Sequence, residues 1–353
     1  MAVLCQLADP DNYRPFDWSL HKNPQDFAYW TKLFADFPIN IEQRLREEPL
    51  NGNHFESRWS EFCREYDAGM ATFRAQATAS DEITTIRLCN FRQSLLNKYG
   101  WYDPYRGIKQ RENEMACSLY PHVVDRVDAT PVDARWEWLL RCLYAGNMFD
   151  LGAPKTIEMF NRGQIDFFAM LEQIPDRPWF IDDVDEVRCR IASNAQWKQV
   201  LFFVDNAGSD IVLGVVPLVR EMARAGIRIV LAANSRPALN DITHEELEPL
   251  LQRLGNGDSV LAELMATDRI ATVPSGGDIP LIDLSHVSNE CNTAAQQSDL
   301  IVLEGMGRGV ESNWRQTFKC DAWRMALIKD ESVARWVGCN VFDPICRFDA
   351  RTP

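Results

Sequence analysis

The sequence predicts an α/β protein in which an N-terminal all-helical domain packs on a doubly wound, mostly parallel, Rossmann-like α/β/α domain. Two observations support this fold class. Up to about Asn194, apolar residues recur at helical spacing, and from Gln199 onward short apolar runs alternate with helical stretches. Runs that are apolar on both faces and separated by helices are typical of a parallel sheet covered on both sides. We therefore place the helical domain at residues 1–195 and the α/β domain at residues 196–353.

The helices of the first domain are predicted from stripes of aromatic and aliphatic residues. Asn23 and Pro24 read as an N-cap followed by proline at the first helical position, ahead of one such stripe. A second stripe begins at Phe55. Two further stretches, residues 82–100 and 134–146, have the helical period, and each closes on a glycine. We expect all of these stripes to form core.

Five apolar runs of the second domain are predicted strands. The first two begin roughly 28 residues apart, about the length of a βαβ unit. Helical stretches at residues 210–226 and 243–255 lie between strands. Sheets of this kind bind ligands at the carboxyl ends of their strands. The predicted strands are residues 199–206, 227–234, 269–275, 299–305 and 323–329.

Polar residues follow the first two of these strands. Asp205 and Asn206 end the first, and Asp241 follows the second. Such residues at a strand end are often turn-formers or helix caps. However, Thr243 and Glu246 form a capping box for the next helix, which leaves Asp241 free for another task. Two acids and an amide at adjacent strand ends make an oxygen-rich site for a hard or borderline divalent cation.

The net charge, the apolar runs and the cysteine spacing limit the classes of binding partner and the cellular compartment that we expect for this protein. The formal net charge of −14 argues against nucleic acid or anionic membranes as main partners, because both require a basic face. The N-terminus lacks the pattern of a secretory signal, and no apolar run is long enough for a membrane span. The ten cysteines form no CxxC pair and no zinc spacing. We therefore expect a cytoplasmic protein with reduced thiols that handles a small molecule.

Three competing motifs fit poorly. Aspartyl-phosphatases of the haloacid dehalogenase type end their first strand in Asp-x-Asp, but the residue two after Asp205 is Ala207. The glycines of "EGMGRG" (residues 304–309) miss the spacing of a dinucleotide-binding loop. The five histidines form no HExxH or paired pattern, which argues against a zinc hydrolase.

Five stretches of the sequence carry a resemblance to a known family, namely "DPYRGIKQREN", "AGNMFDLGA", "FVDNAGSDIVLGVVPLVREM", "ANSRPALNDIT" and "DLIVLEGMGRG". Over nearly its whole length the chain resembles the damage-control phosphatase family, once called domain of unknown function 89. It is most similar to subfamily II, which includes stand-alone plant and fungal proteins and the C-terminal domain of animal pantothenate kinase 4. The motif "EGMGR" is the signature of that subfamily.

The resemblance implies a set of site residues. The metal ligands of the family correspond to Asp205, Asn206 and Asp241, which the strand ends had already indicated. Asp205, Asp241, Lys329 and Arg308 are then the predicted catalytic residues, with the two cations available to phosphate oxygens. The "GMG" segment would bring backbone N–H groups close to the anion; its alternative role is a tight turn, and that of Arg308 a surface salt bridge. The predicted substrate-binding residues are Asn147, Asp150, Glu304, Gly305, Met306, Gly307 and Arg308.

The function implied by the resemblance is that of a metal-dependent phosphatase. Subfamily II hydrolyses 4′-phosphopantetheine and, more readily, its oxidised or sulfonated forms, a damage-control role in coenzyme A metabolism. All-oxygen ligands favour Mn²⁺, Co²⁺ or Ni²⁺, with Mg²⁺ also suitable. Relatives often have Asn at the position of Gly277 and Arg at that of His286, which bears on substrate preference. Two alternatives stay open, a sugar-phosphate phosphatase and a non-catalytic phosphopantetheine sensor, as does the choice between nucleophile and ligand for Asp205.

Overall fold

A computed structural model describes residues 1–15, 20, 23–47, 54–76, 83–148, 167–193 and 197–351. In these ranges, seven strands form one sheet in the order β1-β7-β6-β5-β2-β3-β4. Only the β6–β7 pair is antiparallel, which confirms the predicted mostly parallel α/β fold. The strands are β1 (Ile181–Asp182), β2 (Gln199–Phe203), β3 (Arg228–Ala233), β4 (Ile270–Pro274), β5 (Leu300–Glu304), β6 (Asp321–Leu327) and β7 (Pro344–Asp349).

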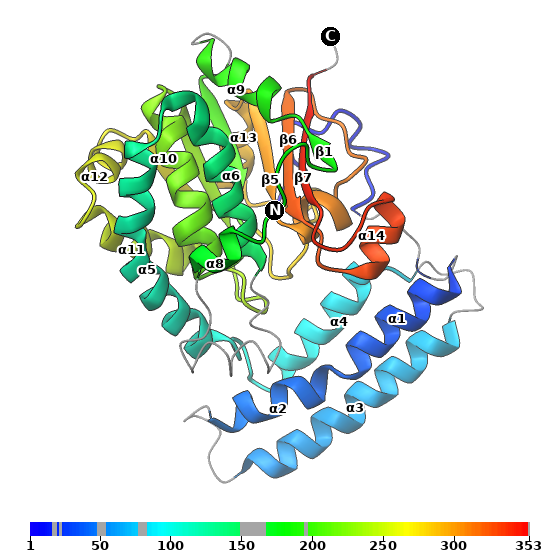
Figure 1. Cartoon of the computed structure of the whole chain (residues 1–353). Coiled ribbons are helices and arrows are strands. Elements are labelled where there is room, and N and C mark those ends of the chain that lie inside the picture. The colour runs from blue at the N-terminus through cyan, green and yellow to red at the C-terminus, as the bar shows by residue number, and fades with distance from the viewer. Residues whose placement is uncertain are drawn as a thin grey trace.

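The helices fall into two sets that differ in what they cover (Figure 1). Helices α1 (Pro24–Ala35), α2 (Phe37–Glu47), α3 (Phe55–Gln76) and α4 (Thr85–Lys98) lie below the sheet in that view. The other set surrounds the sheet. It comprises α5 (Arg106–Ala129), α6 (Val132–Met148), α8 (Phe167–Leu171), α9 (Val184–Ala192), α10 (Val216–Arg224), α11 (His244–Gly255), α12 (Ser259–Ala266), α13 (Asn289–Gln296), α14 (Glu331–Val337) and the π-helical turns η3 (Asp210–Val215) and η4 (Met306–Glu311).

The sheet is buried on both faces. Val200 and Phe202 of β2 belong to a core that also contains residues of α5, α6, α10 and α11. Leu201 and Phe203 point to the opposite face and pack with α13 and the N-terminal residues Leu4 and Leu7. This alternation explains why β2 is apolar at every position, as expected for a strand covered on both sides.

Helices α1 to α4 share a third core with the end of β6, η4 and α14. Polar contacts reinforce the α1–α14 contact: Tyr29 Oη donates to Asp330, and Trp30 Nε1 donates to Ser332 Oγ at 3.2 Å. Helices α5 and α6 instead pack against the sheet with α10. The domain boundary at residue 195 therefore stays a prediction, since helices on both sides of it cover the sheet.

Local signals in the sequence mark several helix ends correctly. Asn23 accepts hydrogen bonds from the first turn of α1, and the capping box of Thr243 and Glu246 is present on α11. The predicted helix end at Gly146 is wrong, because α6 continues through it to Met148. A Cβ at position 146 would lie 2.7 Å from Ser209 O, so this glycine allows α6 to approach the backbone near η3 closely.

Strands β1 and β7 were not predicted. Strand β7 has the sequence "PICRFD", which begins with proline and contains two charged residues, Arg347 and Asp349. Strand β1 has only two residues. Their pairing at the sheet edge, rather than an apolar run, defines them. Among the described helices, none is both long enough and apolar enough to cross a membrane.

Candidate active site at the carboxyl ends of β2, β3 and β5

The site lies where the winding of the sheet reverses. From β2 the chain proceeds to β3 and β4 on one side, and then returns to β5 and β6 on the other. In open α/β sheets, this switch point leaves a crevice that binds ligands. Asp205 follows β2 by two residues, and Glu304 is the last residue of β5. The Asp205 N–H donates to Glu304 Oε2 at 2.9 Å, so the two acids meet at this point.

Two π-helical turns bring further charged residues to the switch point. η3 follows β2 and begins with Asp210, and η4 follows β5 and contains Arg308. Such turns widen a helix locally and are frequent at functional sites. Gly305 precedes η4 with φ +92°, a conformation that favours glycine. A Cβ there would lie 2.5 Å from Asp205 Cγ, so the absence of a side chain makes room for the Asp205 carboxylate.

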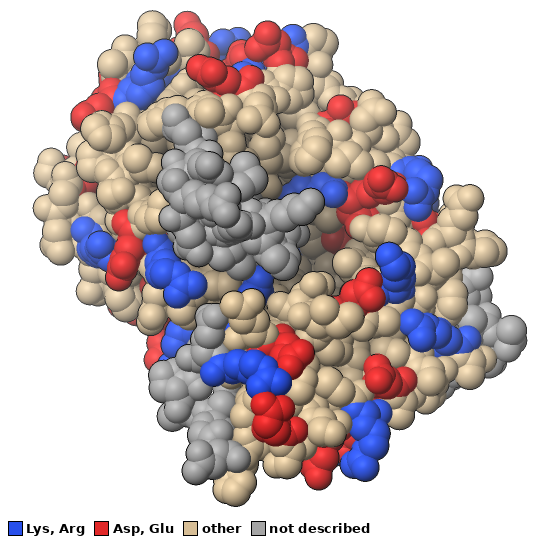
Figure 2. Space-filling model, turned by 60° about the horizontal axis from the view of Figure 1, so that its bottom comes forward, with Lys and Arg blue, Asp and Glu red and all other residues tan. Residues whose placement is uncertain are grey.

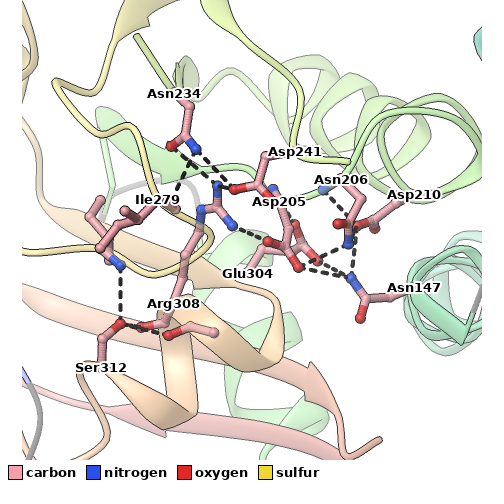
Figure 3. Close-up of polar contacts among 12 residues, drawn as sticks. Asn147, Asp205, Asn206, Asp210, Asn234, Asp241, Ile279, Glu304, Arg308 and Ser312 are labelled. Carbon is pink, nitrogen blue, oxygen red and sulfur yellow. Dashed lines mark hydrogen bonds and ion pairs between the residues drawn. The ribbon is translucent and has the colours of Figure 1, made fainter. Parts of the chain in front are cut away.

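One side of Asp205 faces an acidic cluster (Figure 3). Asn206 Nδ2 donates to Asp205 Oδ2 and to Asp210 Oδ2, both at 3.0 Å. Asn147 Nδ2, from α6, donates to Asp210 Oδ2 at 2.7 Å and to Glu304 Oε1 at 3.3 Å. All five side chains are buried. Two amides thus hold three carboxyl groups together in a space shielded from water.

The other side of Asp205 faces a buried arginine (Figure 3). Arg308 Nη1 pairs with Asp205 Oδ1, and Arg308 Nη2 pairs with Asp241 Oδ2 at 2.7 Å. Asn234, at the end of β3, donates to Asp241 Oδ2 at 2.9 Å and accepts from Arg308 Nη2 at 3.3 Å. The alternative of a surface salt bridge for Arg308 is wrong, because the residue is 1% exposed.

The acidic cluster has the properties of a cation site. Oxygens of Asp205, Asp210 and Glu304 lie within 4.8 Å of one another, so these groups could hold a metal ion. The Oδ1 atoms of Asp210 and Asn147 are buried and have no hydrogen-bond partner among the described residues. Buried oxygens without partners are costly, and an ion that they ligate would remove that cost. The residues present therefore fit a hard, oxygen-bound divalent ion.

Burial and neighbouring carboxylates raise the pKa values of several acids at this site. Burial raises the pKa of Asp210 to about 6, and the neighbouring charge of Asp205 adds to the shift. Burial likewise raises the pKa of Asp241 to about 7 and that of Glu304 well above its usual range. A group shifted this far needs either a proton or a nearby cation.

Lys329 lies at the margin of the acidic cluster. Its Nζ donates to the backbone oxygen of Asn147 at 2.9 Å, and its N–H faces Met306 Sδ at 3.4 Å. Its positive charge offsets part of the rise in the pKa of Asp210, so the ammonium is close enough to act on the cluster.

Two other predicted substrate-binding residues have different outcomes. The backbone carbonyl of Gly307 accepts a hydrogen bond from Ser312 Oγ. The predicted substrate-binding residue Asp150 lies outside the described residues.

The two positions that the sequence analysis connected with substrate preference lie near one another. Gly277 and His286 both line a cavity of about 290 Å³. A Cβ at Gly277 would lie 3.2 Å from Asn234 Oδ1, so the cavity adjoins the Asn234–Asp241 pair.

Figure 2 shows the end of the molecule below the sheet, where acidic and basic side chains are interspersed on the surface.

The structure thus brings together most of the residues that the sequence indicated, namely Asn147, Asp205, Asn206, Asp241, Glu304, Gly305 and Arg308. Asp210 was not predicted, although it stands four residues after Asn206 and so returns to it after one turn. Asn234 is the last residue of the second predicted strand (residues 227–234), but the sequence analysis did not assign it to the site. No local pattern distinguishes it from a turn residue.

Comparisons with known proteins found a family model, curated relatives and a solved structure that are similar to this chain. The family model described as "Damage-control phosphatase ARMT1-like domain" matches residues 37–345. A damage-control phosphatase of Arabidopsis thaliana is 40% identical, over 99% of this chain and 97% of its own length. A crystal structure of a DUF89 family protein from Pyrococcus horikoshii superposes with a TM-score of 0.65 and 18% identity, covering 92% of this chain and 98% of that one, which supports the fold.

Two further relatives are longer proteins. Pantothenate kinase 2 of Arabidopsis thaliana is 31% identical over 99% of this chain but only 42% of its own length. The 4′-phosphopantetheine phosphatase of Mus musculus is 26% identical over 98% of this chain and 48% of its own length. This chain therefore spans less than half of each of these two relatives.

Proposed function

This chain belongs to the ARMT1-like damage-control phosphatase family, and from that premise we propose that it is a metal-dependent phosphatase whose substrates are 4′-phosphopantetheine and its oxidised or sulfonated forms. The observation that carries the proposal is the buried acidic cluster at the switch point of the sheet, with two oxygens that lack partners and two cations beside it. Family membership implies a phosphatase acting on a small phosphate ester; the metal and the particular ester are the proposed part.

We assign the metal to Asp205 as the central ligand. Asp210 and Glu304 offer oxygens on one side of it, where Asn206 is a neutral candidate, and Asp241 offers one on the other side. A divalent ion supplies Lewis-acid polarisation of a phosphoryl oxygen when it is bound. Oxygen ligands without thiolate or imidazole favour Mn²⁺, Co²⁺, Ni²⁺ or Mg²⁺.

The two cations are assigned to the substrate anion. Phosphoryl transfer spreads negative charge over the equatorial oxygens, so fixed positive groups that meet this charge lower the barrier. Lys329 is held by the carbonyl of Asn147, a hydrogen bond that a phosphate oxygen can replace. Arg308 reaches the same crevice from η4. Arg308 is buried and Lys329 is half-buried, so the charge of Arg308 in particular acts in a medium of low dielectric constant, where charge interactions are strong.

The substrate class rests on the sequence motif and on the relatives. The "EGMGR" motif, residues 304–308, forms the end of β5 and the start of η4, directly against Asp205. One relative along nearly the whole chain is named for activity on 4′-phosphopantetheine. Both features favour this ester over a sugar phosphate.

The test is phosphate release from a panel of esters, with the metal-stripped protein and with each of the four ions restored. The panel contains 4′-phosphopantetheine, its sulfonate, and several sugar phosphates. We expect no turnover without metal and the highest kcat/KM for the oxidised or sulfonated pantetheine ester. A preference for sugar phosphates would support the first alternative. Binding of phosphopantetheine without any turnover would support the sensor. Full activity after metal removal would exclude the proposed mechanism.

A further inference from the structure

The guanidinium of Arg308 lies between two carboxylates that the proposed function assigns to the metal. It pairs with Asp205 Oδ1 and with Asp241 Oδ2, and all three side chains are buried. A pair of carboxylates at adjacent strand ends is the arrangement expected to hold a divalent ion. In this structure the charge between them is supplied by the protein itself.

A divalent ion and the guanidinium compete for the same oxygens. Each of these two carboxylate oxygens already accepts a charge-assisted hydrogen bond from Arg308. An ion that used both oxygens would bring a second cation into a buried space, so Arg308 would have to leave the gap. Within the described part of the chain, the carboxylates of Asp210 and Glu304, on the other side of Asp205, form no ion pair with the guanidinium and so stay available.

The backbone of Arg308 and the carboxylate of Asp241 have contacts that do not involve the guanidinium. The carbonyl of Arg308 accepts from Ser312 Oγ at 3.3 Å and from Asn313 Nδ2 at 3.1 Å, which fixes η4 independently of the guanidinium. Asn234 Nδ2 donates to Asp241 Oδ2 at 2.9 Å and would keep Asp241 in place after the guanidinium leaves. The carboxylate positions therefore do not depend on Arg308 alone.

We propose that Arg308 is a built-in counter-cation: it holds Asp205 and Asp241 in the metal-free protein, competes with the divalent ion for them, and once displaced is free to bind the phosphate group of the substrate. This inference rests on the proposed metal-dependent function. It assigns a positioning role to Arg308 in addition to phosphate binding, and it couples the two: the anion-binding cation becomes available when the metal is present.

The test measures metal affinity by calorimetric titration with Mn²⁺, without substrate. The decisive variant is Arg308→Lys, which keeps a positive charge but replaces the planar fork with a single ammonium that cannot bridge two carboxylates. We expect Mn²⁺ to bind at least about tenfold more tightly than to the wild type, because the competitor loses at least one charge-assisted hydrogen bond to the two carboxylates. A purely electrostatic effect of Arg308 predicts an unchanged affinity for this variant.

Two further variants complete the experiment. Arg220→Met is the matched control, because Arg220 is also buried and pairs with two aspartates, Asp128 and Asp258, away from the site. It should lower stability without changing Mn²⁺ affinity. In the Arg308→Lys background, Asp241→Asn should weaken Mn²⁺ binding at least about tenfold, since Asp241 is then a ligand. The folded state of each variant is checked by circular dichroism.

The outcomes separate the inference from the proposed function. Equal Mn²⁺ affinity in the wild type and Arg308→Lys would overturn the counter-cation role while leaving a metal enzyme. Insensitivity of the double variant to the loss of Asp241 would overturn it too, because the ion would then lie wholly on the Asp210 side. Binding in neither the wild type nor Arg308→Lys would overturn both proposals. Binding in Arg308→Lys alone would support the competition in its strongest form.

Discussion

Substitution of Gly305 by alanine tests the most confined contact of the site. Gly305 joins β5 to η4 with φ +92°, and its Cα faces the Asp205 side chain. An added Cβ would lie 2.5 Å from Asp205 Cγ and 2.9 Å from Asp205 Cβ. Because the Asp205 Cβ is fixed by its own backbone, rotation of the carboxylate cannot relieve this contact. The β5–η4 segment or the end of β2 would have to shift.

The expected loss of stability has two parts. A left-handed conformation costs an alanine about 1–2 kcal/mol, and the smaller entropy of the unfolded alanine chain returns about 0.4–1 kcal/mol. Forcing a methyl group into a well-packed site adds about 1–3 kcal/mol. Gly305→Ala should therefore lower the free energy of unfolding by about 2–4 kcal/mol. Displacement of Asp205 on the scale of an ångström should reduce turnover about a hundredfold.

Gly226→Ala provides the matched control. Gly226 has φ +93°, and nothing lies within 4 Å of the position that its Cβ would take. The control should therefore lose only about 1 kcal/mol, the conformational part, and keep full activity. The assay is urea denaturation of both variants in the absence of metal, with phosphate release measured beside it.

The difference between the two variants isolates the contact with Asp205. If Gly305→Ala were no less stable than Gly226→Ala and kept wild-type turnover, the close approach of Gly305 to Asp205 would be wrong, and with it the geometry of the site. Loss of stability with retained turnover would show that Asp205 tolerates displacement and is not the central ligand.

Three further predictions concern charge and positioning. Lys329→Ala should lower turnover about a hundredfold with unchanged Mn²⁺ affinity, because an ammonium cannot be a ligand; near wild-type kinetics would remove Lys329 from the site. Asp210→Asn should weaken Mn²⁺ binding at least about tenfold by calorimetry, and an unchanged affinity would contradict its role as a ligand. Tyr29→Phe deletes the hydrogen bond to Asp330, the cap of α14 next to Lys329, and should cost about 1 kcal/mol with a measurable fall in kcat; unchanged kcat would mean that α1 does not position Lys329.

Much of the fold could be predicted because the central strands of the sheet consist of continuous runs of apolar residues. The strands β2 to β6 each lie within or across one such run, since both faces of the sheet are covered. Strand β7 escaped because its outer half is only partly buried and carries Arg347 and Asp349. The end of α6 was misplaced because Gly146 serves helix packing, and a glycine that permits close approach looks the same in sequence as one that ends a helix.

The site was predictable to the extent that strand ends reveal it. Asp205 and Asp241 follow apolar runs directly, so their position at the sheet edge could be inferred. The contacts of the Asp205 carboxylate with Arg308 on one side and Asn147 on the other could not be inferred. They depend on the rotamers of these two side chains, which come from segments far from β2. Asp210 escaped because its return toward Asn206 depends on the turn between β2 and η3, in which Gly208 has φ +77°.

The pairing of β2 with β5 also determines when the site can form during folding. Val200 lies opposite Leu300, so the strands that carry Asp205 and Glu304 become neighbours only after β3, β4 and the helices between them have been accommodated. Contacts this distant in sequence form late and slow the folding of a domain. A divalent ion at the proposed site would therefore gain Glu304 as a ligand only once β5 has joined β2. Such an ion would favour the paired sheet, by an amount that grows with its concentration above Kd.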